Sequence, residues 1–177
     1  YLYGYYTINP PKNQHPINLE QIIANGGFDC VKFVIEQYKE DSTCKWKKLN
    51  LSNNRLCMTA AYHGYANILK YLHQSGCVMN EDALDKAAKK SKFECLKYLI
   101  DNGIPFTNKT AELTVKNSGC SGHEDSFDCL KYIMDHGCRI TSEVIQECCR
   151  YGSWKCLKYM IDNVSFCTAE PKCNTFG

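Results

Sequence analysis

The chain has 177 residues, 44% of them hydrophobic, and its 21 Lys and Arg nearly balance its 19 Asp and Glu, which leaves a formal net charge of +2. This length and composition suit one domain or one short repeat array with a buried core, and they exclude an intrinsically disordered chain. The small net charge provides no broad positive field, which disfavours nucleic acid as a partner. No apolar run approaches 18 residues, so no membrane span and no membrane partner are predicted.

Residues 1–15 are rich in Tyr and contain Asn9-Pro10-Pro11, a combination that stiffens the backbone and stops a helix. We therefore predict an extended lead-in there. Tyr1–Tyr6 lacks the basic flank of a signal peptide or anchor. Pro16 suits the first position of a helix, because its missing N–H costs no hydrogen bond there. The first helix is thus predicted to begin at Pro16 and to end at Asn25-Gly26-Gly27.

One stretch, Phe93–Gly103, is repeated along the chain. Close copies lie at Phe127–Gly137 and Trp154–Asn163, and looser copies lie at Phe28–Glu36 and Ala66–His73. Five copies indicate a repeat protein. Each copy has a narrow polar stripe with i, i+3, i+7 spacing, and apolar residues cover the other sides, which predicts a helix that neighbours surround on most sides.

The polar stripe of Phe93–Gly103 consists of Glu94, Lys97 and Asp101. An ion pair along such a stripe stabilises a helix by about 0.2–0.5 kcal/mol. Burial of one large apolar side chain contributes roughly 1.5–3 kcal/mol. Packing therefore dominates, and the repeated Lys is predicted to be a solvated surface residue rather than part of a site.

The repeat unit has 27 residues, which is the separation of Lys70 from Lys97 and of Lys131 from Lys158. The same register aligns four residues that can cap a helix by accepting a bond from a free backbone N–H: Asn53, Asn80, Thr107 and Thr141. These caps predict the first helices of repeats two to five over residues 54–62, 81–89, 108–117 and 142–150. The connectors before the caps are too short for a long hairpin.

Two intervals between copies exceed 27 residues, by about 11 and by 7, and place insertions within residues 38–52 and 119–126. The first contains Lys45-Trp46-Lys47-Lys48, the most basic short run of the chain. This run can be a small nucleic-acid patch, or an exposed loop whose Trp packs on the array, and we favour the loop. No further copy follows Asn163, so residues 16–164 are predicted to form a single array and residues 165–177 a cap or tail.

Thirteen cysteines are an odd number, and the chain is longer than the small secreted domains that disulfides hold together. Cys30, Cys95, Cys129 and Cys156 share one repeat position, where the second copy has Ile68. This position therefore requires a compact apolar side chain. We predict reduced core cysteines in a reducing intracellular compartment, with disulfides as the minor alternative.

The segment from Ala60-Ala61 through Gly64 to Leu72 resembles the Ala-Ala, Gly and amphipathic second helix of an ankyrin repeat. The Cys-Leu-Lys-Tyr unit resembles, more narrowly, the short ankyrin-type repeats of large DNA viruses of amoebae. The Thr-Pro-Leu-His motif is absent and the period is below the usual ~33 residues, so β-hairpin fingers are not expected. The resemblance implies an all-α solenoid of about five helix-turn-helix repeats. It also implies an adaptor that binds another protein, in a virus a host protein, in the host cytoplasm or the virion.

Motifs for other chemistry are incomplete. Cys120 and His123 have the spacing of zinc ligands but lack a second pair, so a metal or redox protein is a minor alternative. Cys148-Cys149 aligns with Ala60-Ala61, which indicates small buried residues. No Gly-rich phosphate loop and no Gly-x-Ser-x-Gly turn is present. We predict no enzymatic activity, no cofactor and no small-molecule substrate.

The predicted partner surface combines the basic run with polar positions of the first helices. It comprises Trp46, Lys47, Lys48, Asp82, Asp85, Lys86, Lys109, Glu112, Glu143, Gln146 and Glu147. Trp46 is the predicted aromatic anchor, because buried aromatic residues dominate binding energy. The alternative function is that of a structural component of a larger assembly, such as a virion, packed permanently along its sides.

Overall fold

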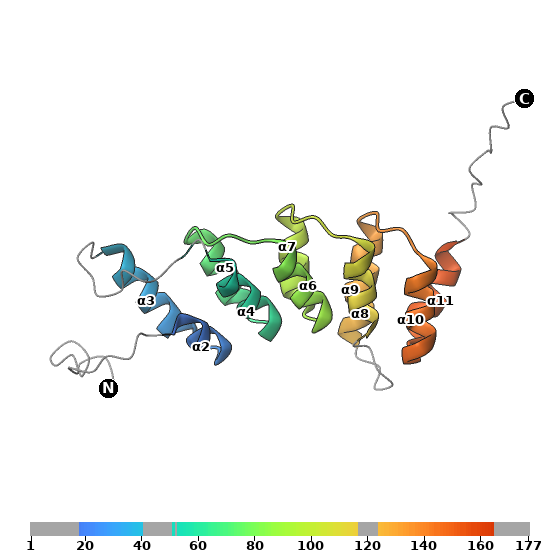
Figure 1. Cartoon of the computed structure of the whole chain (residues 1–177), viewed down its shortest axis with the longest axis horizontal. Helices are drawn as coiled ribbons and strands as arrows, with labels where there is room; N and C mark the ends of the chain where they lie inside the picture. Colours follow the sequence, from blue (N-terminus) through green and yellow to red (C-terminus); the bar gives the residue numbers. More distant parts are fainter. Residues whose placement is uncertain (1–17, 41–50, 52, 117–123, 165–177) are drawn as a thin grey trace, which may run out of the picture.

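The computed structural model describes residues 18–40, 51, 53–116 and 124–164. Within these ranges the chain forms ten helices and no strand (Figure 1). The helices are α2 (Leu19–Ala24), α3 (Phe28–Glu40), α4 (Arg55–His63), α5 (Ala66–Gln74), α6 (Glu81–Lys89), α7 (Phe93–Asp101), α8 (Asn108–Lys116), α9 (Glu124–Asp135), α10 (Ser142–Tyr151) and α11 (Trp154–Val164). None of the described helices has the length and apolar character needed to span a membrane.

The helices form a two-layer solenoid of five helix-turn-helix repeats, as the sequence predicted. The first helix of each repeat (α2, α4, α6, α8, α10) packs against the next first helix, and the second helices (α3, α5, α7, α9, α11) do the same in their own layer. Small buried residues such as Ala60 and Ala87 let the first helices pack more closely with one another than the second helices do. The connectors between repeats follow one edge of the array (Figure 1).

The helix boundaries differ from the predicted ones at three places. The first helix begins at Leu19, not at Pro16, because the Asn18 side chain caps it by accepting a hydrogen bond from Gln21 N–H at 3.3 Å. Pro16 and the lead-in lie outside the described residues. Helix α3 continues to Glu40 and α9 already begins at Glu124, so both helices extend into the ranges assigned to insertions.

The four predicted caps behave differently. The Asn80 side chain accepts a hydrogen bond from the N–H three residues later, at 3.2 Å, as predicted. Asn53 accepts one from the N–H two residues later, but the residue that caps α4 is Asn54. Thr141 precedes α10, yet its side chain makes no capping bond and its buried Oγ1 has no hydrogen-bond partner among the described residues. Position in the register therefore sets where a helix starts, but not which group satisfies its N–H donors.

The shared cysteine position is buried in three of its four copies. Cys95, Cys129 and Cys156 are core residues, and Ile68 is buried at the same position of repeat two. Cys30 is exposed, which contradicts the prediction of a core residue. The reason is its place in the array: α3 is the first described helix of its layer, so no described helix precedes it.

A contact between repeats explains why the motif recurs. Phe93, Lys97 and Asp101 lie along one stripe of α7 and surround Tyr132 of α9; we call such a set a tyrosine cradle. The rings of Phe93 and Tyr132 meet edge to face, with centroids 5.8 Å apart. Lys97 Nζ lies 6.0 Å from the centroid of the Tyr132 ring, and the Tyr132 hydroxyl donates a hydrogen bond to Asp101 Oδ1. Lys97 is exposed, as predicted, but it also contacts the next repeat.

Other repeats use variants of this cradle. Phe127 meets Tyr159 edge to face at 5.6 Å, and the Tyr159 hydroxyl donates to Asp135 Oδ1 at 2.9 Å. Repeat two has Ala66 in place of the Phe, and there His73 contacts the next tyrosine through a 2.8 Å hydrogen bond between its Nδ1 and the Tyr98 hydroxyl. The recurring Lys-Tyr pair thus builds the array.

Candidate functional site

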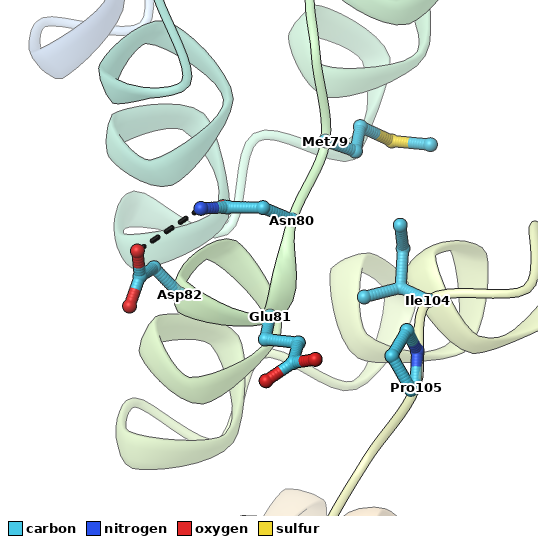
Figure 2. A pocket seen from close by; sticks show the side chains of 6 residues that line it. All are labelled: Met79, Asn80, Glu81, Asp82, Ile104 and Pro105. Atoms are coloured by element: carbon cyan, nitrogen blue, oxygen red, sulfur yellow. Dashed lines mark hydrogen bonds between the residues drawn. The ribbon is translucent and has the colours of Figure 1, made fainter.

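The connectors before α6 and α8 form a groove on one edge of the array (Figure 2). Its volume is about 350 Å³, and we call it the connector groove. Its lining residues are Met79, Asn80, Glu81, Asp82, Ile104 and Pro105. The groove exists because two connectors that are 27 residues apart in the sequence lie side by side in the solenoid.

The connector groove has an apolar part and an acidic part. Met79 and Ile104 supply apolar surface from the two connectors, and both are partly buried. Glu81 and Asp82 are exposed in the first turn of α6, where the helix dipole stabilises negative charge. Asn80 orders this corner, because its Nδ2 donates a 3.0 Å hydrogen bond to Asp82 Oδ2 while its Oδ1 caps the helix.

The eight predicted site residues on the first helices all lie on α6, α8 and α10. Asp82, Lys109, Glu143 and Gln146 are exposed, whereas Asp85, Lys86, Glu112 and Glu147 are partly buried. Helix α8 lies between α6 and α10, so these residues form a row along the array rather than one cluster (Figure 1). Trp46, Lys47 and Lys48 lie outside the described residues.

The structure brings two of these residues together. Lys109 Nζ lies 3.4 Å from Asp85 Oδ2, and Thr110 Oγ1 donates a 2.9 Å hydrogen bond to Asp85 Oδ1. Asp85 therefore ties α6 to α8. An exposed pair of this kind stabilises by about 0–1 kcal/mol.

Two other predicted site residues pair within their own helices. Glu112 Oε2 lies 3.9 Å from Lys116 Nζ, and Glu147 Oε1 lies 3.2 Å from Arg150 Nη1. These acids are therefore already partly neutralised by intramolecular partners. Glu143, in contrast, is exposed at the start of α10, where its own backbone N–H lowers the pKa of its carboxyl and keeps it ionised.

The arrangement is suited to contact with a surface. Within the described ranges, no group of three or more His, Cys, Asp or Glu is placed to hold a metal ion. Cys120 and His123, the residues of the metal alternative, lie outside those ranges. Cys148 is buried as predicted, but Cys149 is exposed, which corrects the prediction that both members of the pair are buried.

Sequence reasoning missed the apolar side of the connector groove. It selected polar residues on helices, whereas Met79, Ile104 and Pro105 lie in connectors. A signal was available: the connector residues Cys77-Val78-Met79 and Ile104-Pro105-Phe106 are apolar although connectors are usually polar surface. Val78, at 49% exposure, is a large apolar side chain that the same pattern places beside the groove.

Comparisons with known proteins agree with this architecture. A family model of ankyrin repeats, in three copies, matches residues 19–112. Among the curated proteins no match is found. Among solved structures, the ankyrin repeat domain of human ASB11 is similar, with a TM-score of 0.64 and 16% sequence identity, over 85% of this chain and 69% of that chain. At this identity the similarity concerns the fold.

Proposed function

The chain belongs to the ankyrin-repeat family, whose model covers more than half of its residues, and from this premise we propose that it is a non-catalytic adaptor that binds another protein through the connector groove. Ankyrin repeats generally mediate protein–protein interaction. The observation that carries the proposal is the groove itself, where Glu81 and Asp82 adjoin the apolar Met79 and Ile104. The exposed polar residues of α8 and α10 extend this surface along the array.

The chemistry of the groove defines the kind of partner. Glu81 and Asp82 carry two negative charges at one end of it, and no described ion pair neutralises either residue. A partner segment that presents Lys or Arg beside an aliphatic or aromatic side chain matches both parts. Opposite charges across an interface raise the association rate and fix the orientation, and apolar burial contributes the affinity.

The proposal includes the setting in which the protein acts. The Cys-Leu-Lys-Tyr repeat resembles viral ankyrin-type repeats, which supports a viral protein whose partner is a host protein. The buried cysteines, which are free thiols in the described residues, support a reducing compartment such as host cytoplasm. We propose residues 16–164 as one array, with the insertions within 38–52 and 119–126 as the places where a contact specific to this chain is added.

A pair of matched charge-reversal variants tests the proposal. In E81K/D82K the acidic end of the groove becomes basic, while D29K/E94K makes the same change in charge in the first turns of two second helices, on the other layer. The unaltered chain and both variants are used for affinity capture, and the captured proteins are identified by mass spectrometry.

We expect E81K/D82K to lose a partner that D29K/E94K retains, at least tenfold by intensity, while circular dichroism and melting temperature stay close for the two variants. Equal capture by both variants would refute a role for the groove. A chain that elutes only as large assemblies in size-exclusion chromatography, with no separable partner, would favour the structural alternative instead.

A further inference from the structure

The last described helix, α11, presents a tyrosine cradle that no tyrosine occupies among the described residues. Trp154, Lys158 and Asp162 stand at i, i+4 and i+8, the positions of Phe93, Lys97 and Asp101 in α7. Trp154 is 65% exposed and Ile161 is 61% exposed, and Lys158 and Asp162 are exposed as well. We call Trp154, Lys158, Ile161 and Asp162 the end face.

The equivalent residues in earlier repeats are covered by the next repeat. Ile100, at the position of Ile161, is buried. Phe127, at the position of Trp154, meets the ring of Tyr159, and Asp135, at the position of Asp162, accepts its hydroxyl hydrogen bond at 2.9 Å. The same chain therefore shows which chemistry fits the end face: an aromatic ring against Trp154 and a hydroxyl donor at Asp162.

We propose that the end face binds a helix pair of a second ankyrin-type protein, whose second helix presents a tyrosine. The tyrosine ring meets Trp154 edge to face, its hydroxyl donates to Asp162, and the helix covers Ile161. The surface is distinct from the connector groove, so the protein has two binding surfaces. Continuity with the interfaces between its own repeats is what identifies the occupant.

Two nearer sources of the occupant do not supply this chemistry. Residues 165–177 contain no tyrosine. A second copy that docked through its first repeat would present Phe33, which takes the tyrosine position in α3 and has no hydroxyl for Asp162. The carboxylate of Asp162 thus selects for a partner with tyrosine at this position.

The experiment uses Trp154 as its own reporter. In a Trp46→Phe background, Trp154 is the sole tryptophan. A probe repeat, a copy of residues 141–164, is joined after Cys167 in place of residues 168–177, which keeps the 27-residue spacing. In the copy, the residue corresponding to Trp154 is changed to Phe, which α7 and α9 carry there, and the residue corresponding to Tyr159 is left as Tyr or changed to Phe or Ala.

We expect the Tyr-bearing probe repeat to shift the emission of Trp154 to shorter wavelength and to reduce its quenching by acrylamide severalfold. The Phe version should protect Trp154 less, and the Ala version least. Asp162→Ala should weaken the protection given by the Tyr version and leave that of the Phe version unchanged. This dependence on the hydroxyl distinguishes recognition of a tyrosine from simple covering of an apolar patch.

Three results would overturn the proposal. Trp154 could stay exposed in the extended chain. It could be shielded already in the unextended chain and become exposed when residues 165–177 are deleted, which would assign the end face to the tail. It could also be shielded with increasing protein concentration as a dimer forms, which would assign the end face to a second copy. None of these results bears on binding at the connector groove.

Discussion

Gly26 and Gly103 hold similar left-handed backbone conformations, with φ of +73° and +81°, but their surroundings differ. A Cβ at Gly26 would lie 2.8 Å from the Tyr65 ring, whereas a Cβ at Gly103 would meet nothing within 4 Å. Gly103→Ala should therefore cost only the left-handed conformation, roughly 1–2 kcal/mol. Gly26→Ala should cost more, because the ring must also move.

Urea denaturation of the two variants measures this difference in the free energy of unfolding. In a Tyr65→Ala background the excess cost of Gly26→Ala should disappear. Equal losses for both glycine variants in the unaltered background would show that the Tyr65 ring adapts freely and that the close approach carries no energy.

The cysteines provide a second prediction at the scale of single residues. Cys95 and Cys129 are fully buried, and burial raises the pKa of each thiol to about 12, so the reactive thiolate is scarce in the folded protein. Cys30 and Cys149 are exposed. Brief alkylation of the native protein by iodoacetamide at pH 8, read by peptide mass spectrometry, should label Cys30 and Cys149 and should spare Cys95 and Cys129 until urea is added.

Comparable labelling of all four cysteines in the native protein would contradict their division into core and surface residues. The sequence placed Cys30 in one class with Cys95 because it compared positions within the repeat. Position within the whole array decides burial, and a repeat pattern does not contain it. The same limit applies to Ile161, which is exposed although its equivalent Ile100 is buried.

At the scale of the helix, the structure gives the recurring motif its physical meaning. The sequence identified the helices closely, because their amphipathic pattern and the 27-residue register are local properties. It interpreted the Lys and Asp of each copy as solvent-exposed residues, which they are. It did not reveal that Lys97 and Asp101 also contact Tyr132, because this contact joins residues more than 30 positions apart through the packing of α7 on α9.

The tyrosine cradle predicts a pH dependence of stability. The bond to Asp101 raises the pKa of Tyr132 to about 12, whereas an unfolded tyrosine ionises near pH 10. Since the folded pKa is the higher one, the stabilisation is fully present below pH 10 and is lost as the pH rises toward 12. Tyr132→Phe should therefore cost about 1 kcal/mol at pH 8, a value kept low because the pair is exposed.

The difference between the unaltered protein and Tyr132→Phe should shrink as the pH is raised from 9 to 11. Comparison of the two chains by urea denaturation at each pH cancels the titration of lysines and buried thiols, which both chains share. A difference that is constant across this range would show that the hydroxyl does not bond to an ionised carboxylate.

At the scale of the whole molecule, the array converts distant connectors into one surface. Each repeat contributes one connector, and only the stacking of repeats sets Met79 opposite Ile104. The sequence predicted the layer of first helices and most of its exposed polar residues. It could not predict that Asp85 pairs with Lys109, or that the groove has an apolar part, because both follow from how adjacent repeats are rotated and spaced.

The central claim is that a partner protein binds at the connector groove, and hydrogen–deuterium exchange of the purified complex tests it most directly. The complex is formed with the protein that E81K/D82K fails to capture, and exchange is compared with that of the free chain. We predict slower exchange in residues 77–82 and 104–107 and unchanged exchange in α7 and α9. Protection confined to the second helices, with none in the connectors, would contradict the account.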